Sequence, residues 1–186
     1  SKLYKKFDKI YAVSNEAKKQ IGEVIPSVKD KTETFFNIIS SKAINSMKDE
    51  KVSFDDNFKG VNIATVGRLS HEKGQDLAME AMNKLKKDGY IFKWYLVGDG
   101  SSRKKYEEMI HKYRLENECI LVGSISNPYP YMYKSDIYVQ TSRHEGYCLT
   151  LAEARCLHKP IITTNFIGAY EQINDGENGY IVDCKV

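Results

Sequence analysis

The chain has 186 residues and a formal net charge of +3, and 41% of its residues are hydrophobic. This length and composition predict a folded domain with a sizeable core and exclude a disordered chain. The charge is too small to indicate a nucleic-acid partner, and no apolar run approaches the roughly 20 residues that a membrane helix requires.

The first sixty residues predict short elements followed by a polar linker. Residues 9–14 and 34–39 have the composition of strands, and residues 15–21 predict a short helix with Ser14 as its N-cap. Residues 42–57 are polar and predict an irregular linker or a mobile loop.

From Val61 onward, short β-rich runs alternate with amphipathic helices. This alternation predicts an α/β fold: a Rossmann-like three-layer sandwich with a mainly parallel sheet of about six strands. The expected strands are 61–66, 92–97, 119–122, 137–140, 161–163 and 180–182. The expected helices are 74–87, 102–114, 128–134, 151–157 and 169–173. In such a sheet, residues that follow the strands meet at one rim, where ligands bind.

Two acids lie near one predicted helix start. Glu145 follows the strand 137–140, and Glu153 lies one turn into a helix that begins near Thr150. Unpaired N–H groups at a helix start suit a phosphate. Carboxylates would repel that phosphate, but they accept hydrogen bonds from vicinal hydroxyls. A ligand with hydroxyl groups on both sides of a phosphate has the chemistry of a nucleotide sugar.

Each of these acids also has a structural explanation. Thr150 and Glu153 have the spacing of a capping box, and Glu145 by itself fits a solvated loop acid. Cys148 is either a reactive thiol beside the phosphate site or a packed bystander. The four cysteines lack metal-site spacing, which predicts reduced thiols in a cytosolic protein.

Arg68 and Lys73 follow the first core strand and are candidates for holding a diphosphate. Arginine can grip phosphate through two bonds, and lysine acts as a point charge. The alternative is a surface arginine and a helix-start lysine, although lysine is unfavourable at a positive helix end. Gly98 and Gly100 have the spacing of the first two glycines of a dinucleotide fingerprint, but Arg103 stands where that fingerprint requires a third glycine. The two glycines therefore predict a tight turn.

Several ordered motifs between Val61 and Val182 resemble one known family. They are Val66-Gly67-Arg68-Leu69, Glu72-Lys73-Gly74, Val97-Gly98-Asp99-Gly100, Ser135-Asp136-Ile137, the paired glutamates and Asp175-Gly176-Glu177-Asn178-Gly179. The sequence resembles the C-terminal domain of retaining group 1 (family 4) nucleotide-sugar glycosyltransferases of the GT-B fold. Tyr147 fits the family pattern, whereas Cys148 stands where glycine or proline is common, which bears on local loop shape.

The resemblance implies a donor-binding half-enzyme. Residues 1–58 are expected to be a remnant of the N-terminal domain and a linker packing on the core, and residues 59–186 to form the nucleotide-sugar-binding domain. The implied catalytic residues are Arg68, Lys73 and Glu145. The implied donor-binding residues are Gly67, Gly98, Ile125, Gly146, Tyr147, Cys148, Leu149, Thr150 and Glu153.

The implied reaction is transfer of a hexosyl unit from a nucleoside diphosphate sugar with retention, in surface polysaccharide or glycoconjugate assembly. The donor is the substrate, and no cofactor or metal is implied. The acceptor, a saccharide or a lipid-linked saccharide, is expected to be held mainly by the missing N-terminal domain. The chain alone is therefore expected to bind donor weakly and to transfer nothing.

The expected location is the cytoplasm, at the inner face of the membrane if the lysine clusters make a peripheral contact with anionic lipid. Two other functions remain open from the sequence. One is a sugar-nucleotide epimerase or phosphorylase of the same fold, and the other is a non-catalytic nucleotide-binding module.

Overall fold

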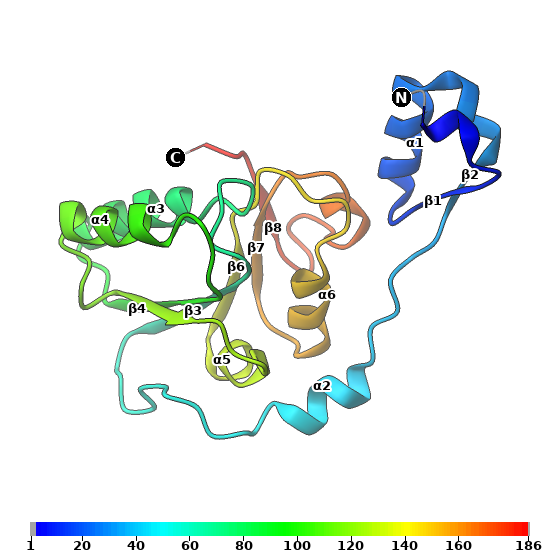
Figure 1. Cartoon of the computed structure of the whole chain (residues 1–186). Coiled ribbons are helices and arrows are strands. Elements are labelled where there is room, and N and C mark those ends of the chain that lie inside the picture. The colour runs from blue at the N-terminus through cyan, green and yellow to red at the C-terminus, as the bar shows by residue number, and fades with distance from the viewer. Residues whose placement is uncertain (1–2, 186) are drawn as a thin grey trace.

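The structure is a computed structural model that describes residues 3–185. It contains a two-stranded and a six-stranded sheet, both parallel, which are joined by an extended segment and a short helix (Figure 1).

Residues 3–34 form a small N-terminal unit. Strand β1 (Ile10–Ala12) pairs with β2 (Thr32–Thr34), and helix α1 (Asn15–Val24) connects them. Two 3-10 helices complete the unit, η1 (Tyr4–Lys6) and η2 (Pro26–Lys31). The Ser14 side chain accepts a hydrogen bond from the Ala17 N–H at 3.1 Å, which confirms the predicted N-cap of α1.

The predicted strand at 34–39 is wrong in its position. Strand β2 ends at Thr34 because its partner β1 is only three residues long, and the last backbone bond runs from the Phe35 N–H to the Ala12 carbonyl at 2.8 Å. Beyond that bond the chain has no partner strand, and the Phe35, Phe36 and Ile38 side chains are exposed.

The prediction of an irregular linker over 42–57 is also wrong in part, because α2 (Ser41–Met47) begins this segment. Ser40 caps the helix by accepting a hydrogen bond from the Ala43 N–H at 3.3 Å. Ile44 is buried in the core cluster to which α5 and α6 contribute. One apolar anchor among polar residues gives too weak a periodicity to be recognised in the sequence.

The six-stranded sheet is parallel throughout and has the strand order β5-β4-β3-β6-β7-β8. Its strands are β3 (Val61–Val66), β4 (Phe92–Val97), β5 (Cys119–Gly123), β6 (Ile137–Gln140), β7 (Ile161–Thr164) and β8 (Tyr180–Val182). The predicted sheet is confirmed.

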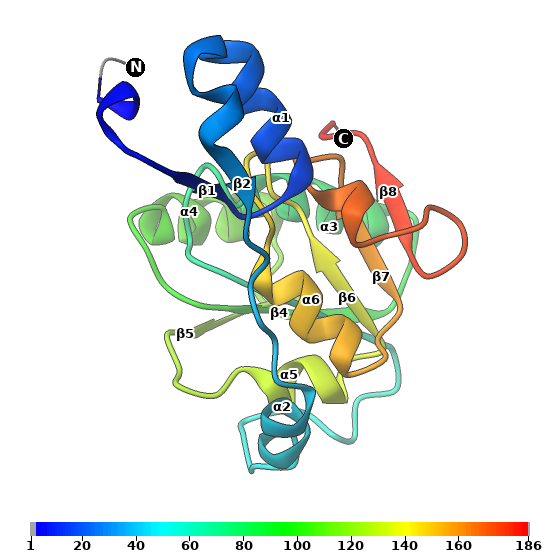
Figure 2. The same cartoon turned by 90° about the vertical axis from the view of Figure 1, so that its right-hand side faces the viewer.

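Helices cover both faces of this sheet. Helices α3 (Gln75–Lys87) and α4 (Arg103–Tyr113) pack on one face, and α5 (Tyr129–Lys134) and α6 (Leu149–Cys156) pack on the other (Figures 1 and 2). A 3-10 helix, η3 (Ala169–Glu171), follows β7. Alternate residues of one strand feed the two cores: Trp94 packs with α3 and α4, and Tyr95 packs with α5. This is the predicted three-layer sandwich.

The strand order creates a switch point between β3 and β6. From β3 the chain proceeds outward through β4 and β5, and from β6 it proceeds to the opposite edge. Loops that leave β3 and β6 therefore lie side by side at the rim where open α/β sheets bind ligands. Within residues 3–185, no helix is long and apolar enough to span a membrane.

Candidate functional site

Two loops meet at the switch point, one after β3 and one after β6. The Arg143 N–H donates to the Glu72 carbonyl at 2.7 Å, and the Thr141 hydroxyl donates to the Lys73 carbonyl at 3.3 Å. Gly74 has a left-handed φ of 66°, and a Cβ there would lie 2.0 Å from the Thr141 carbonyl oxygen. Glycine at position 74 therefore lets the two loops touch.

A charged pair joins these loops. The Lys73 ammonium donates to Glu145 Oε1, and the two side chains are 24% and 13% exposed. The Ser142 hydroxyl donates to the same oxygen at 2.9 Å. Because one carboxylate oxygen already has two donors, the other can accept hydrogen bonds from a ligand.

A buried hydrogen-bond chain lies behind Glu145. The Tyr138 hydroxyl donates to Gln140 Oε1 at 2.7 Å, and Gln140 Nε2 donates to the Ser142 hydroxyl at 2.7 Å. All three side chains are fully buried. Since the amide of Gln140 occupies the Ser142 oxygen, the hydroxyl hydrogen is directed at Glu145.

A second ion pair, between Arg143 and Asp76, joins the loop after β6 to α3. Arg143 donates to both oxygens of Asp76 at 2.7 and 3.2 Å, which ties the β6 loop to the first turn of α3. Burial acts to raise the pKa of Asp76, but hydrogen bonding and charge from Arg143 and Lys105 together outweigh it and hold that pKa below its usual value.

Arg68 is exposed at the end of β3. Within residues 3–185, no carboxylate lies within 4.0 Å of its guanidinium, so its charge is available to an anion. Its backbone carbonyl accepts from Gln75 Nε2 at 2.8 Å. A Cβ on Gly98 would lie 2.1 Å from the Gly67 carbonyl, so close packing of the two strand ends by itself requires glycine at position 98.

The start of α6 has no side-chain cap. The N-cap residue is Cys148, which adopts a left-handed φ of 64° and whose side chain makes no capping bond. A left-handed conformation is costly for any residue with a Cβ, so Cys148 carries backbone strain at this helix start. The Leu149 and Thr150 N–H groups at this helix start point outward from the first turn and suit an anion.

The capping-box interpretation of Thr150 and Glu153 is wrong. The helix begins two residues before the position that a box would need, and the Thr150 hydroxyl donates to Gln140 Oε1 at 3.3 Å. Glu153 instead accepts a hydrogen bond from the Tyr129 hydroxyl at 3.2 Å. Burial raises the pKa of Glu153, and the bond from Tyr129 acts in the opposite direction.

The Cys148 thiol is buried beside this site. Burial, together with the nearby charge of Glu145, raises its pKa to about 11. The thiol therefore stays protonated at neutral pH and is a poor nucleophile, as expected for a packed bystander.

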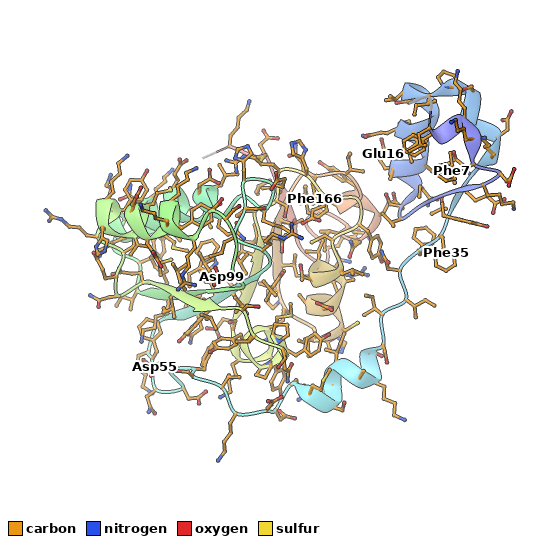
Figure 3. All side chains as sticks on the ribbon, in the orientation of Figure 1. Phe7, Glu16, Phe35, Asp55, Asp99 and Phe166 are labelled. Carbon is orange, nitrogen blue, oxygen red and sulfur yellow. The ribbon has the colours of Figure 1, made fainter. Side chains whose placement is uncertain are left out.

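The N-terminal unit faces the Glu145 loop across a cleft of about 620 Å³. Gln20 and Ile21 of α1 line one side, and His144, Glu145 and Gly146 line the other. Glu16 and Phe166, which Figure 3 labels on the two sides, line an adjoining hollow.

A carboxylate from the large sheet's side also holds α1. The Glu171 side chain accepts hydrogen bonds from the backbone N–H groups of Asn15 at 3.0 Å and Glu16 at 2.8 Å. Glu171 therefore connects the large sheet's side of the molecule to the N-terminal unit.

The model of the family described as glycosyl transferases group 1 matches residues 47–186. The chain belongs to the group 1 glycosyltransferases.

Two curated relatives extend this assignment. The chain is 30% identical over 169 residues to the glycosyltransferase MJ1059 of Methanocaldococcus jannaschii, a match that covers 88% of this chain and 41% of that protein. It is 29% identical over 184 residues to N-acetylgalactosamine-N,N'-diacetylbacillosaminyl-diphospho-undecaprenol 4-alpha-N-acetylgalactosaminyltransferase of Campylobacter jejuni, covering 98% of this chain and 48% of that protein. The chain spans about half the length of these relatives.

Among solved structures, Anabaena HepE in complex with UDP and glucose superposes with a TM-score of 0.84 at 20% identity. The match covers 99% of this chain and 52% of HepE. At this identity the likeness concerns the fold.

The structure brings some of the predicted site residues into contact and spreads others along the rim. Lys73 and Glu145 touch, and Gly98 packs on Gly67. The predicted residues Gly146, Tyr147 and Cys148 form the turn into α6, with the Tyr147 carbonyl accepting from Gln172. Ile125 is exposed on the loop after β5, whose Gly123 carbonyl accepts from the Gly98 N–H at 2.9 Å.

Sequence reasoning missed the residues that orient the two acids: Gln140, Ser142 and the hydroxyl of Tyr129. A polar glutamine at the end of an otherwise apolar strand was the one available signal, because a buried amide needs partners.

Proposed function

We propose that the chain is the donor-binding part of a retaining transferase that moves a hexosyl unit from a nucleoside diphosphate sugar. The observation that carries the proposal is the Lys73–Glu145 pair at the switch point, next to the uncapped start of α6. This pair places a cation that suits a phosphate beside a carboxylate oxygen that suits sugar hydroxyls.

In this proposal the diphosphate lies at the start of α6, between that helix and the two basic side chains. Arg68 and the remaining N–H groups of Lys73 neutralise it, and the Leu149 and Thr150 N–H groups donate to it. These donors also stabilise the departing diphosphate as the sugar bond breaks, which is where negative charge develops.

The two glutamates hold the sugars on either side of the diphosphate. Glu145 accepts hydrogen bonds from hydroxyls of the donor hexose, and Glu153 accepts from the ribose diol. The names of similar proteins support a place in surface-glycan assembly, because the Campylobacter jejuni relative is a transferase named for an undecaprenol-linked substrate. We therefore propose a lipid-linked or free saccharide acceptor, with catalysis at the cytoplasmic face of the membrane.

Nucleotide binding tests this function directly. UDP, GDP and ADP are titrated calorimetrically into the wild-type chain and into Glu153→Ala, with Glu108→Ala on the exposed surface of α4 as a matched control. UDP is the first probe, because HepE was crystallised with it. Loss of the diol contact should cost roughly 1–3 kcal/mol, or about 5- to 150-fold in Kd. A wild-type chain that binds none of the three nucleotides refutes the proposal.

Charge at the phosphate site has its own test. Arg68→Ala should weaken UDP binding by roughly 1.5–3 kcal/mol, since a charge-assisted hydrogen bond is lost, and should leave uridine binding unchanged. Equal weakening of both ligands would place Arg68 away from the phosphates. Retention is tested on the full-length transferase, by the anomeric configuration of the product.

A further inference from the structure

Tyr129 is the first residue of α5 and reaches across to α6. Its hydroxyl donates to Glu153 Oε1 at 3.2 Å. Within residues 3–185, no other protein group donates a hydrogen bond to that carboxylate, and no lysine, arginine or histidine lies within 4.0 Å of it. One carboxylate oxygen is therefore held by the phenol, and the second is left for a ligand.

The backbone that carries Tyr129 is itself anchored. The Tyr129 N–H donates to Asn127 Oδ1 at 3.2 Å. The Asn127 amide in turn donates to the Met47 carbonyl at 2.8 Å and to Glu50 Oε2 at 2.6 Å. Asn127 is buried, so the start of α5 is fixed to the end of α2. The phenol consequently reaches Glu153 from a rigid base.

The surroundings of Glu153 make this hydrogen bond important. The carboxylate is half-buried, and the nearby titratable groups from the packed elements are Tyr129 of α5, Tyr138 of β6 and Cys156 of α6. None of these carries a positive charge. The phenol of Tyr129 is therefore the group that favours the ionised carboxylate, which is the form that accepts from two hydroxyls.

We propose that Tyr129 is a positioning residue, which holds Glu153 by one oxygen and thereby directs the other at the ribose diol of the donor. This inference rests on the proposed function of Glu153. Fixing a long side chain before the ligand arrives removes part of the ordering cost of binding.

The test compares UDP with 2′,3′-dideoxy-UDP in the wild-type chain and in Tyr129→Phe. The wild type should prefer UDP. Tyr129→Phe should weaken UDP binding roughly 3- to 10-fold and leave the dideoxy analogue unchanged, because only the diol contact is affected. The pH below which UDP affinity falls should also rise in this variant, since the carboxylate has lost the donor that favours its ionised form.

Tyr131→Phe is the matched control. Tyr131 lies on the same helix, and its hydroxyl donates to the Ser53 carbonyl at 2.9 Å rather than to a carboxylate. Its loss should reduce stability without changing the preference for UDP over the dideoxy analogue. The fluorescence of the single tryptophan, Trp94, and near-ultraviolet circular dichroism establish that each variant is folded.

The outcomes separate the two proposals. If the wild type binds UDP and its dideoxy analogue equally, Glu153 does not hold the diol and both proposals fall. If the wild type discriminates and Tyr129→Phe discriminates equally well, Glu153 keeps its role and Tyr129 loses its own. Equal weakening of both ligands in Tyr129→Phe makes Tyr129 a packing residue and also overturns the inference.

Discussion

At the residue scale, the two glutamates of the site are held in different ways. Glu145 has an ammonium and a hydroxyl on one oxygen, and Glu153 has a single phenol in a half-buried position. We therefore expect Glu153 to be ionised when it binds its ligand. Its ionisation in a half-buried position lowers the stability of the folded chain, which is a common trade-off at binding sites.

Glu153→Gln should raise the melting temperature at pH 7. Burial raises the folded-state pKa of Glu153 above its ordinary value of 4.5, so the folded chain binds this proton more tightly than the unfolded chain. The free energy of unfolding therefore falls as pH rises through the interval from 4.5 to the raised value, and the loss is complete above it. Glutamine avoids this loss and keeps an acceptor for Tyr129.

Thermal melts of both chains at pH 7 and pH 4 check this prediction. The difference in melting temperature should shrink towards zero at pH 4, where the glutamate is neutral in the folded chain. An equal gain at both pH values would point to packing rather than to charge.

Ser142→Ala should destabilise the chain by roughly 1–3 kcal/mol. Removing this hydroxyl leaves the buried amide of Gln140 without its acceptor and takes a donor from Glu145. Urea unfolding measures the change. Ser46→Ala in α2 is the control, because that serine is exposed and bonds only within its own helix; its effect should stay within about 0.5 kcal/mol.

At the scale of elements, α1 is capped from two directions. Ser14 satisfies the Ala17 N–H from within the chain's own turn, and Glu171 satisfies the two preceding N–H groups from the far side of the cleft. A negative charge at this helix end is also favoured by the helix dipole. The start of α1 thereby fixes how the N-terminal unit sits on the large sheet.

Glu171→Ala should loosen α1 by roughly 0.5–2 kcal/mol, the usual cost of losing an N-cap. Hydrogen exchange of the amides of residues 15–24 measures this loss, and exchange in the six-stranded sheet should stay unchanged. Glu171→Gln retains a neutral acceptor and should give an intermediate effect. Glu177→Ala, which removes an exposed acid from the next loop, should have none. Protection of α1 that survives Glu171→Ala would contradict the role of this cap.

At the scale of the whole molecule, the segment after the N-terminal unit packs on the core of the large sheet and its helices. Ile44 is buried among residues of α5 and α6, and Phe54 stacks on Tyr95 with ring centroids 4.5 Å apart. The small sheet contributes no residue to either of the two core clusters. The small sheet is therefore a separate packing unit, whereas Ile44 and Phe54, in the segment that follows it, pack with the large sheet.

A chain lacking residues 1–36 should keep the six-stranded sheet. Trp94 is buried and donates to the Thr65 hydroxyl at 2.9 Å, so its emission reports on that sheet. A chain lacking residues 1–54 should unfold at a lower urea concentration, because loss of buried Ile or Phe side chains costs roughly 2–5 kcal/mol each. Equal midpoints for the two shortened chains would contradict this division.

The sequence by itself determined the order of elements from Val61 onward, the parallel sheet and the family. These features follow from the hydrophobic periodicity within each helix or strand, and from glycines and charged residues at the ends of strands. The rim that collects Arg68, Lys73 and Glu145 was predictable for the same reason, since strand ends in a parallel sheet meet at one edge.

Only the tertiary structure decided which groups hold the site residues. Tyr129 and Glu153 are 24 positions apart, Lys73 and Glu145 are 72 apart, and Glu16 and Glu171 are 155 apart. No local period links such residues, because each contact depends on how separate helices and loops pack. The length of β2 and the existence of α2 were decided in the same way, by a partner strand and by a core that a linear sequence does not display.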